Sequence, residues 1–422
     1  MRLLPIVLSL SLFSCSIFAQ ITNASFDLNQ IERISMPEMD NTILIEAERK
    51  RRLVGEAHEF AKSHKTHITP KTHGNWEVTP DGRATWRVRI YSKAAKSLNF
   101  GFTTYKMPQG GKLTLYSKDL KDIKGPFTTE DNEIHHQLWT PIILGEETVL
   151  EVSIPTEKKE ELEIILSHVS HDFLGFGNLL TQRCHVDVVC SQEDGWELLD
   201  EYRDIIRSVG LYFIGGVRIC TGFLVNNVRQ DCRPYFMTAD HCGINSGNAP
   251  SVVVYWNYEN QSCRPVNTAE NGRRGNGSLE DFNTGSTLLS RYESSDMILL
   301  ELDDPVSEKA EAFFAGWDQS STAPDTTICI HHPNTEEKRI SFSYTPTYRG
   351  TWARDDEAVE NGDHLIVPSW DIGSTEGGSS GAPLFDKNKR IVGQLHGGEA
   401  SCGNNNYDSF GFFHTSWEGG RT

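Results

Sequence analysis

The cysteines of this chain are confined almost entirely to its second half. Of nine cysteines, one is Cys15 and the other eight lie between Cys184 and Cys402. No Cys-x-x-Cys pair occurs, which disfavours a zinc knuckle or a dithiol redox site. An even number of cysteines in an exported chain is typical of disulfide cross-links, although spacing alone does not decide which cysteines pair. We therefore expect residues 184–422 to form a disulfide-linked unit, distinct from what precedes it.

Residues 1–19 have the pattern of a secretory signal peptide. Arg2 precedes a short apolar run that ends at the small residue Ala19, which suits cleavage there. The run is slightly short for a membrane span, and no other stretch approaches the roughly 18 apolar residues that a span needs. The segment ending at Cys15 faintly resembles a lipoprotein cleavage box, in which Phe13 is a poor fit. We expect a protein that is secreted from the cell or exported to the periplasm.

Charge is distributed unevenly along the chain. The formal net charge is −18, and such an acidic chain lacks the basic surface that nucleic-acid binding requires. Residues 20–160 are balanced, with 20 basic and 20 acidic residues, whereas residues 161–422 hold 19 basic and 38 acidic ones. The first part has 13 Lys and 7 Arg, but the second has 4 Lys and 15 Arg. An acidic surface alone would lower both bases, so the scarcity of lysine needs a separate explanation.

The chain after the signal peptide reads as two folded units. Within residues 20–70, apolar residues recur at helical spacing around a basic run at 49–52, which predicts an amphipathic helix with a solvated basic face. Residues 71–172 show short alternating runs separated by turn residues, which predict a β-sandwich. Residues 173–183 read as a linker. Residues 184–422 again contain many short strands, typical of paired barrels or a large sandwich.

Three short motifs in the second unit carry chemically useful side chains. An apolar strand ends in Thr238-Ala239 just before His241, an aspartate at position 296 leads into another apolar strand, and Ser380 lies within a glycine-rich turn. Singly, these could be a packed histidine, a strand cap and a flexible turn. Together they supply a general base, an orienting acid and a nucleophile in the order His, Asp, Ser. Gly378 permits the turn in which two backbone N–H groups converge on one point.

With these motifs, the sequence resembles the chymotrypsin-like serine proteases and most closely the bacterial lysyl endopeptidases. The resemblance covers about residues 182–418 and includes the runs at 184–190, 203–210, 220–227, 330–334 and 393–398. It implies an all-β fold, in which a double six-stranded antiparallel barrel follows a β-sandwich-like pro-domain. Residues 184–422 would be the trypsin-like protease domain. It further implies a triad of His241, Asp296 and Ser380, an oxyanion hole at Gly378 and Ser380, and no metal or cofactor.

The resemblance also suggests which residues select the substrate. Asp408 matches the aspartate at the floor of the primary pocket, and a carboxylate about 4 Å from an ammonium contributes roughly 4 kcal/mol at an effective dielectric of about 20. That energy selects a basic residue but does not distinguish lysine from arginine. Trp352 and His396 would narrow the pocket, and Gly397 and Gly398 would offer backbone to the substrate. The alternatives are a surface position for Asp408 and simple packing for Trp352.

Disulfides are likewise implied by the resemblance, as Cys184–Cys402, Cys190–Cys263 and Cys220–Cys242. Cys232 and Cys329 have no counterpart in the best-known relatives, and we predict that they pair with each other. Relatives continue into a C-terminal helix beyond the point at which this sequence stops. His331 and His332 could suggest a metal pair, but relatives share them without a catalytic metal, so we interpret them as structural.

The sequence therefore predicts a secreted, monomeric endopeptidase that cleaves after lysine and has peptide substrates and its own pro-domain as partners. Few lysines in the protease domain would protect such an enzyme from itself. Self-cleavage after lysine near Cys184 is excluded, because the nearest upstream lysine is Lys159. Either another protease acts, for example at Arg183, or the mature enzyme keeps a longer N-terminal tail. The alternatives are a protease of the same fold with arginine or broader basic specificity, and a secreted adhesin with an inactive site.

Overall fold

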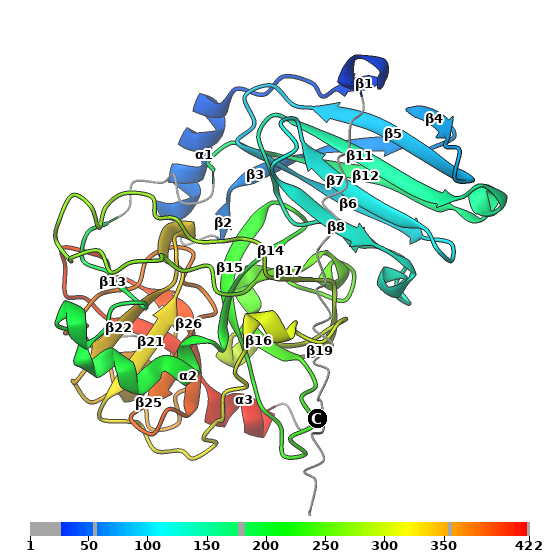
Figure 1. Ribbon diagram of the computed structural model, residues 1–422. Coiled ribbons are helices and arrows are strands. Elements are labelled where there is room, and N and C mark those ends of the chain that lie inside the picture. Colours follow the sequence, from blue (N-terminus) through cyan, green and yellow to red (C-terminus); the bar gives the residue numbers. More distant parts are fainter. Residues whose placement is uncertain (1–26, 54–56, 176–181, 353–356, 420–422) are drawn as a thin grey trace, which may run out of the picture.

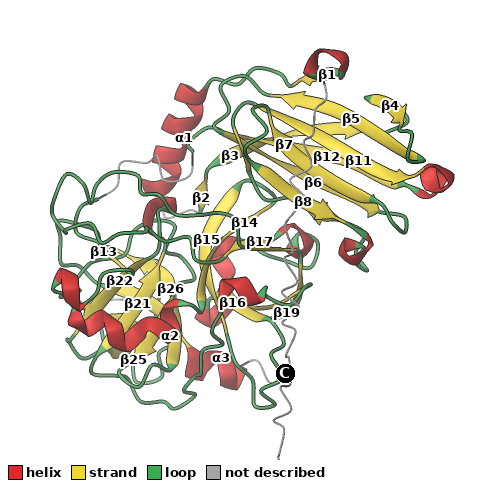
Figure 2. Ribbon diagram, in the orientation of Figure 1, coloured by secondary structure: helices red, strands yellow, loops and turns green. Residues whose placement is uncertain are grey.

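The N-terminal part of the protein is a sandwich of two β-sheets. The computed structural model describes residues 27–53, 57–175, 182–352 and 357–419. The first sheet contains β1 (Arg33–Ser35), β4 (Asn75–Val78), β5 (Arg83–Tyr91), β7 (Lys112–Ser117), β8 (Ile123–Phe127) and β11 (Glu147–Pro155). The second contains β3 (Ala61–Ile68), β6 (Ser97–Lys106), β9 (Leu138–Trp139), β10 (Ile143–Leu144) and β12 (Glu163–Asp172). The orders are β1-β5-β11-β7-β8, with β4 on β5, and β10-β6-β12-β3, with β9 on β6 (Figure 1, Figure 2).

Alternation of side chains explains why these segments form a sandwich. Along β5, Trp86, Val88 and Ile90 are buried in the core between the sheets. The arginines between them face outward, and Arg87 pairs across the strands with Glu151, with Nε 2.6 Å from Oε2. A strand with one buried and one charged face fits a sheet that is covered on one side.

The predicted N-terminal helix is present but shorter than expected. Helix α1 (Asn41–Leu53) has buried Glu48 on its inner side, and residues 61–68, which we had assigned to the helical segment, form strand β3. Strand pairing with β12 outweighs the helical pattern there. The linker is also shorter than predicted at its start, because Phe173 and Leu174 are buried; residues 176–181 lie outside the described residues, as does the predicted signal peptide.

The C-terminal part, which the resemblance predicts to be a protease domain and which we call the protease part, consists of two further antiparallel sheets. The first contains β2 (His58–Glu59), β14 (Val209–Ile214), β15 (Arg218–Leu224), β16 (Tyr235–Ala239), β17 (Val253–Tyr255), β18 (Phe282–Thr284), β19 (Ser286–Tyr292) and β20 (Met297–Leu302). The second contains β13 (Val186–Asp187), β21 (Thr327–His331), β22 (Arg339–Ser343), β23 (Tyr348–Gly350), β24 (His364–Val367), β25 (Pro383–Asp386), β26 (Ile391–Gly398) and β27 (Asp408–Phe412). The orders are β18-β17-β14-β15-β16-β20-β19, with β2 on β15, and β13-β22-β21-β25-β26-β27-β24-β23.

The protein is thus mostly β, as predicted, although each protease sheet has eight hydrogen-bonded strands rather than six. The additional strands are short: β13 has two residues, and β2 comes from the N-terminal region. Helices are few: α2 (Arg203–Ile206), α3 (Phe413–Gly419) and the 3-10 turns η1 (Leu28–Gln30), η2 (Thr129–Asp131), η3 (Thr156–Glu161), η4 (Gln192–Asp194), η5 (Glu197–Tyr202), η6 (Asp240–Cys242), η7 (Ala249–Ser251), η8 (Glu293–Ser295), η9 (Glu308–Ala310) and η10 (Pro333–Thr335). Within the described residues, no helix is long and apolar enough to cross a membrane.

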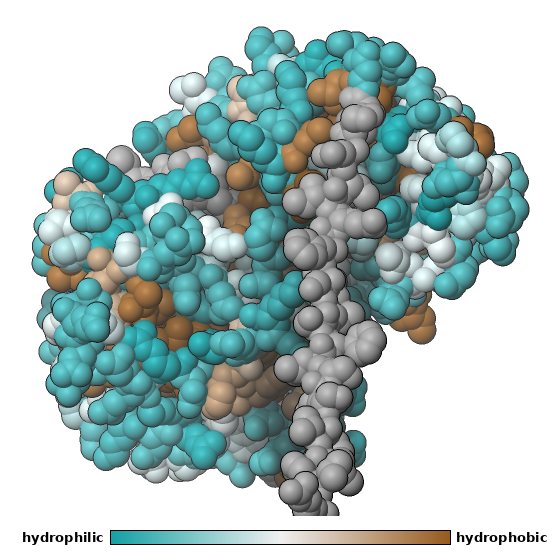
Figure 3. Space-filling view, viewed as in Figure 1, coloured by the Kyte–Doolittle hydropathy of each residue, from teal (hydrophilic) through white to brown (hydrophobic). Residues whose placement is uncertain are grey.

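The two parts share a hydrophobic core and a strand pairing. Phe60, Trp139 and Phe173 of the sandwich pack in one buried cluster with residues of the protease part that include Phe213 and Tyr255. Strand β2 adds to the edge of β15, with Ile219 opposite His58. In Figure 1, α1 runs from the sandwich toward the protease sheets. Figure 3 shows that the face in view is mainly hydrophilic, with small hydrophobic patches. The contact between the two parts is therefore an apolar core extended by backbone hydrogen bonds.

Three disulfides link the protease part, and they are the three pairs that the resemblance implied: Cys184–Cys402, Cys190–Cys263 and Cys220–Cys242. The predicted fourth pair is wrong. Cys329 is buried in β21 among apolar side chains, whereas Cys232 is exposed in the loop before β16, and both are free. A bond between a strand in the core and an exposed loop would require backbone movement that the packed sheet does not allow.

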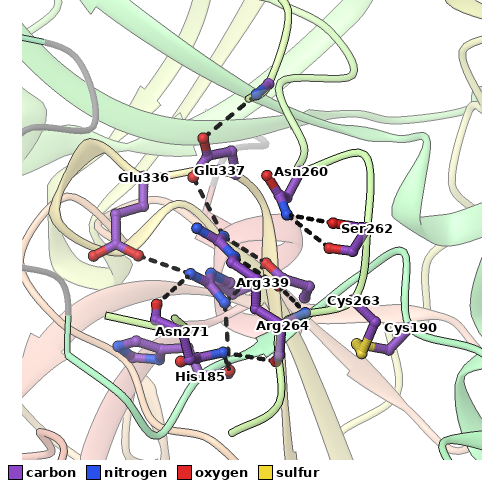
Figure 4. A network of polar contacts seen from close by, with 12 residues as sticks. His185, Cys190, Asn260, Ser262, Cys263, Arg264, Asn271, Glu336, Glu337 and Arg339 are labelled. Carbon is purple, nitrogen blue, oxygen red and sulfur yellow. Dashed lines mark hydrogen bonds and ion pairs between the residues drawn. A yellow bond between two sulfur atoms is a disulfide. The ribbon is translucent and has the colours of Figure 1, made fainter. Parts of the chain in front are cut away.

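A buried ionic network anchors the start of the protease part. Asp187 Oδ1 lies 2.7 Å from Arg264 Nη2 and 2.8 Å from Arg339 Nη1, and all three side chains are almost fully buried. Figure 4 shows the two arginines facing Glu336 and Glu337, with the Cys190–Cys263 disulfide beside them. Buried charges persist when they are paired in this way. Residues 184–190 are thus attached to the second sheet of the protease part.

Candidate active site

His241 lies where strand β16 turns away from the first protease sheet. The strand ends at Ala239, and the turn η6 carries His241 between buried Asp240 and the disulfide-bonded Cys242. Asp240 is paired with Arg291, with Oδ1 2.6 Å from Nε. The disulfide to β15 and this ion pair hold the turn from both sides, so the imidazole has a fixed position.

Asp296 is buried beside His241 and holds its ring. The side chain is 2 % exposed, and Oδ2 accepts from His241 Nδ1 at 2.8 Å while Oδ1 accepts from the His241 backbone N–H at 2.7 Å. Burial would raise the pKa of Asp296, but its interactions with His241 and His396 hold that pKa below its usual value. Asp296 has a φ of +53°, a left-handed conformation that costs a non-glycine residue energy. Gln394 Nε2 donates a hydrogen bond to the backbone carbonyl of Asp296 at 3.0 Å.

Ser380 lies in the turn before β25. Gly378 has a φ of +92°, which favours glycine, and its carbonyl accepts from Thr221 Oγ1 at 2.9 Å. Buried His331 fixes the middle of the turn, because its Nδ1 lies 2.8 Å from Ser379 Oγ. Among the described residues, no hydrogen bond joins Ser380 Oγ to His241; such bonds are often long before substrate binds.

Ser380 and His241 face one cavity of about 440 Å³. The cavity brings together most of the residues that the sequence singled out, namely His241, Trp352, Ser380, His396, Gly397, Gly398 and Asp408. Asp296 lies behind His241. Gly378 is in the turn that carries Ser380 and is not itself part of the cavity lining. The cavity also contains residues that sequence reasoning missed as site residues, which are Arg52, His58, Asn334, Thr375 and Glu376.

Asp408 lines this cavity and is not on the protein surface. It is 1 % exposed, and Oδ2 accepts from Trp370 Nε1 at 2.7 Å and from Thr375 Oγ1 at 2.5 Å. Burial raises the pKa of Asp408 to about 7, although those hydrogen bonds oppose the shift. A Cβ at Gly398 would overlap Asp408 Oδ1, so glycine is required there. The carboxyl group is thus desolvated but lines a cavity that can admit a cation.

Three rings form a stack along one wall of the cavity. His396 lies between Trp352, at a ring distance of 3.7 Å, and His241, at 5.1 Å. Trp352 is 45 % exposed, so its contact with His396 is a cap over the cavity wall and not core packing. Burial lowers the pKa of His396 to about 3, even though Asp296 opposes this shift. His396 is therefore uncharged at neutral pH.

The basic face of α1 is a further departure from the sequence interpretation. The sequence predicts a solvated face, but Arg52 of that face lines the cavity, and its Nη1 donates to Asn334 Oδ1 at 3.3 Å. His58 of the following strand β2 lines the cavity as well. Burial, followed by the charges of Arg52 and Arg51, lowers the pKa of His58 to about 3. The only available signal was the basic run itself, which is equally typical of an exposed helix.

Two clusters of side chains have the composition of metal ligands within the described residues: Cys184, His185 and Cys402, and His241, Asp296 and His396. In the first, the two sulfur atoms are joined in a disulfide. In the second, His241 Nδ1 and Asp296 Oδ2 are bonded to each other. Both sets of atoms are therefore already engaged with protein partners.

Two antiparallel β-sheets with a histidine and a serine facing one cavity between them define a chymotrypsin-like serine protease. Family profiles narrow this class: the lysyl endopeptidase N-terminal domain matches residues 28–173, and the lysyl endopeptidase C-terminal domain matches residues 180–413. The chain therefore belongs to the lysyl endopeptidase family and is a serine endopeptidase.

Individual proteins that resemble the chain share less than a third of its sequence in the matched regions. A lysyl endopeptidase of Pseudomonas aeruginosa is 27% identical over 355 residues, which cover 78% of this chain and 72% of that protein. Among solved structures, the thermostable serine protease AL20 from an extremophilic microorganism is 13% identical over 51% of this chain and 95% of its own, with a TM-score of 0.35. The active form of the Rv3671c protease from M. tuberculosis is 16% identical over 51% and 79%, with a TM-score of 0.31.

Proposed function

We propose that the protein is a secreted endopeptidase that cleaves peptide bonds on the carboxyl side of lysine. The observation that carries the proposal is the single cavity whose lining contains His241 and Ser380 together with the buried Asp408. An extended peptide lying along it would present its carbonyl to Ser380 and its side chain to Asp408. Three disulfides support an oxidising destination for the protein.

In the proposed reaction, His241 accepts the hydroxyl proton of Ser380 as the oxygen attacks the substrate carbonyl. Asp296 supports this step because its bond to Nδ1 leaves Nε2 free to act as the base, and its charge stabilises the imidazolium. Backbone N–H groups of Gly378 and Ser380 would stabilise the oxyanion, and the loss of one such donor typically costs about 3–4 kcal/mol. The protonated histidine then donates to the leaving amine, and water repeats the attack on the acyl-enzyme.

The preference for lysine is supported by the walls of the pocket as well as by its floor. A carboxylate attracts both lysine and arginine, but the stacked rings of Trp352 and His396 narrow the entrance, which favours the slimmer ammonium group. The distribution of lysine in the chain supports the same substrate. Of the four lysines in the protease domain, Lys338 is fully buried. A lysine-specific enzyme could therefore cleave the folded domain only after Lys309, Lys387 or Lys389.

We further propose that residues 20–172 are a pro-domain that blocks the site until it is removed. Support comes from Arg52 and His58 in the cavity and from the shared apolar core. Lys159 lies in the turn η3, far along the chain from Cys184, so processing near Cys184 calls for a different protease. Arg183 is the candidate cleavage point.

Digestion of a denatured protein by the processed enzyme tests the lysine proposal. Mapping the new C-termini should give predominantly lysine, with Ser380→Ala as the matched inactive control. New termini at arginine would favour the arginine-specific alternative. Failure of the processed chain to react with a fluorophosphonate probe would favour the inactive adhesin.

A further inference from the structure

A pair of residues outside the cavity lining contacts the ring stack from behind. His364, at the start of β24, is 1 % exposed, and its Nε2 lies 2.9 Å from His396 Nδ1. On its other side, His364 Nδ1 lies 2.8 Å from Asp363 Oδ1. The contacts form a continuous chain from Asp363 through His364 to His396, whose Nδ1 is also 3.7 Å from Asp296 Oδ2.

The positions of the protons follow from what each atom can do. An ionised carboxylate only accepts hydrogen bonds, so the proton between Asp363 and His364 belongs to His364 Nδ1. In a neutral imidazole the other nitrogen is then an acceptor, so His364 Nε2 accepts a hydrogen bond from His396. His396 must therefore carry its proton on Nδ1, on the same side as the Asp296 carboxylate.

We propose that Asp363 and His364 are positioning residues that hold His396 as its neutral Nδ1–H tautomer against His241. The inference rests on the proposed reaction, in which His241 becomes positively charged in the transition state. A neutral ring stacked at 5.1 Å and 15° accommodates that charge, whereas a second imidazolium at this distance would oppose it. The pair thus acts on catalysis through His396 and does not touch the substrate.

The charged and titratable groups around His396 agree with this assignment. Asp296 and His241 face it from the first protease sheet, His364 and Asp363 from β24, and Trp352 covers its outer face. Of these, His241 and His364 disfavour a charge on His396, and both carboxylates favour it, so the ring is kept neutral by burial and by its histidine neighbours.

The tautomer can be tested without reference to peptide cleavage. In the full unprocessed chain labelled with ¹⁵N-histidine, two-bond couplings should assign the His396 proton to Nδ1, with His396→Gln identifying the signal. In His364→Phe, which fills the space but accepts no hydrogen bond, the signal should move toward the Nε2–H form. An Nε2–H tautomer in the unmodified chain would overturn the proposal even if lysine specificity holds.

Kinetics on the processed enzyme provide the second readout. His364→Phe should lower kcat by roughly tenfold, as the loss of a hydrogen-bonded partner behind a functional imidazole typically does, and should move the acid limb of kcat/KM to higher pH. His364→Gln, whose carbonyl can replace Nε2 as acceptor, should restore most of kcat. His414→Gln is the matched control, because His414 lies on α3 and its Nδ1 is 2.8 Å from the carbonyl oxygen of Gln319.

Each result decides the question. If His364→Phe does not fold, Asp363→Asn and His364→Gln still provide the pH profile and the tautomer signal. An unchanged kcat and an unchanged His396 signal in all folded variants would show that the pair only fills space. Loss of lysine specificity in the unmodified enzyme would instead count against the proposed function and leave the tautomer result standing.

Discussion

His58 from the N-terminal part lies directly against Gly377 in the turn that carries Ser380. A Cβ atom at Gly377 would overlap the His58 ring, so the absence of a side chain there is what allows the two parts to meet. The backbone of His58 at the same time pairs with Ile219 of β15. The N-terminal part is therefore attached next to Ser380 by the backbone pairing of β2 with β15 as well as by the contact of His58 with Gly377.

The first prediction concerns this insertion. In the unprocessed chain, the double substitution Arg52→Ala with His58→Ala should increase the rate at which a fluorophosphonate probe labels Ser380, because both side chains occupy the cavity. Arg49→Ala, on the same helix but exposed and 3.9 Å from the Glu46 carboxylate, is the matched control. Equal labelling rates in all three proteins would mean that the cavity is not blocked by these residues.

The second prediction is that Asp408→Asn lowers kcat/KM for lysyl substrates by about a thousandfold. Loss of a carboxylate about 4 Å from an ammonium removes roughly 4 kcal/mol at an effective dielectric of about 20. A substrate with a neutral side chain of similar length should be affected much less. A comparable loss for both substrates would indicate damage to the pocket and not the loss of a charge.

The third prediction is that the selectivity for lysyl substrates depends on pH, because the carboxyl group of Asp408 titrates. Burial raises the pKa of Asp408 to about 7, so below that pH the group is neutral and no longer attracts the ammonium. The ratio of kcat/KM for a lysyl substrate to that for the neutral substrate should therefore rise as the pH increases through about 7. Dividing the two profiles removes the titration of His241, which affects both. Asp408→Asn should abolish the rise.

The fourth prediction separates the two free cysteines. A thiol reagent should modify Cys232 rapidly in the native protein, whereas Cys329 should react only after unfolding, because it is buried and its pKa is raised by burial. In a chain that lacks residues 1–19, and with them Cys15, one reactive thiol in native protein and two in denaturant is the expected count. If no thiol reacted in either condition, Cys232 and Cys329 would have to be joined in a disulfide, contrary to the structure.

The fifth prediction concerns the disulfide that holds the His241 turn. Replacing Cys220 and Cys242 together should lower the free energy of unfolding by roughly 3 kcal/mol, because the bond closes a loop with a sequence separation of 22. Urea unfolding measures this change. Cys232→Ser, at an exposed position without a partner, should leave the unfolding midpoint unchanged and serves as the control.

Local patterns were sufficient for many elements. Alternation predicted the strand around residues 85–91, which has one apolar face, and a continuous apolar run predicted the strand at 297–302. The His241, Asp296 and Ser380 motifs were recognisable because their chemistry depends on immediate neighbours. The helical assignment of residues 20–70 is wrong at residues 61–68, where pairing with β12 produces a strand. Pairing with a distant strand leaves no local signal.

The sequence by itself determined which residues could act as acid, base and nucleophile, and where a charge-balanced region without cysteine gives way to an acidic region with eight cysteines. Only the tertiary structure decided that Arg52 and His58 enter the cavity, that Cys232 and Cys329 stay apart, and that His364 reaches His396. The reason is physical. Side-chain chemistry is a property of a single residue, whereas burial, stacking and hydrogen-bond partnership depend on which distant segments the fold brings together.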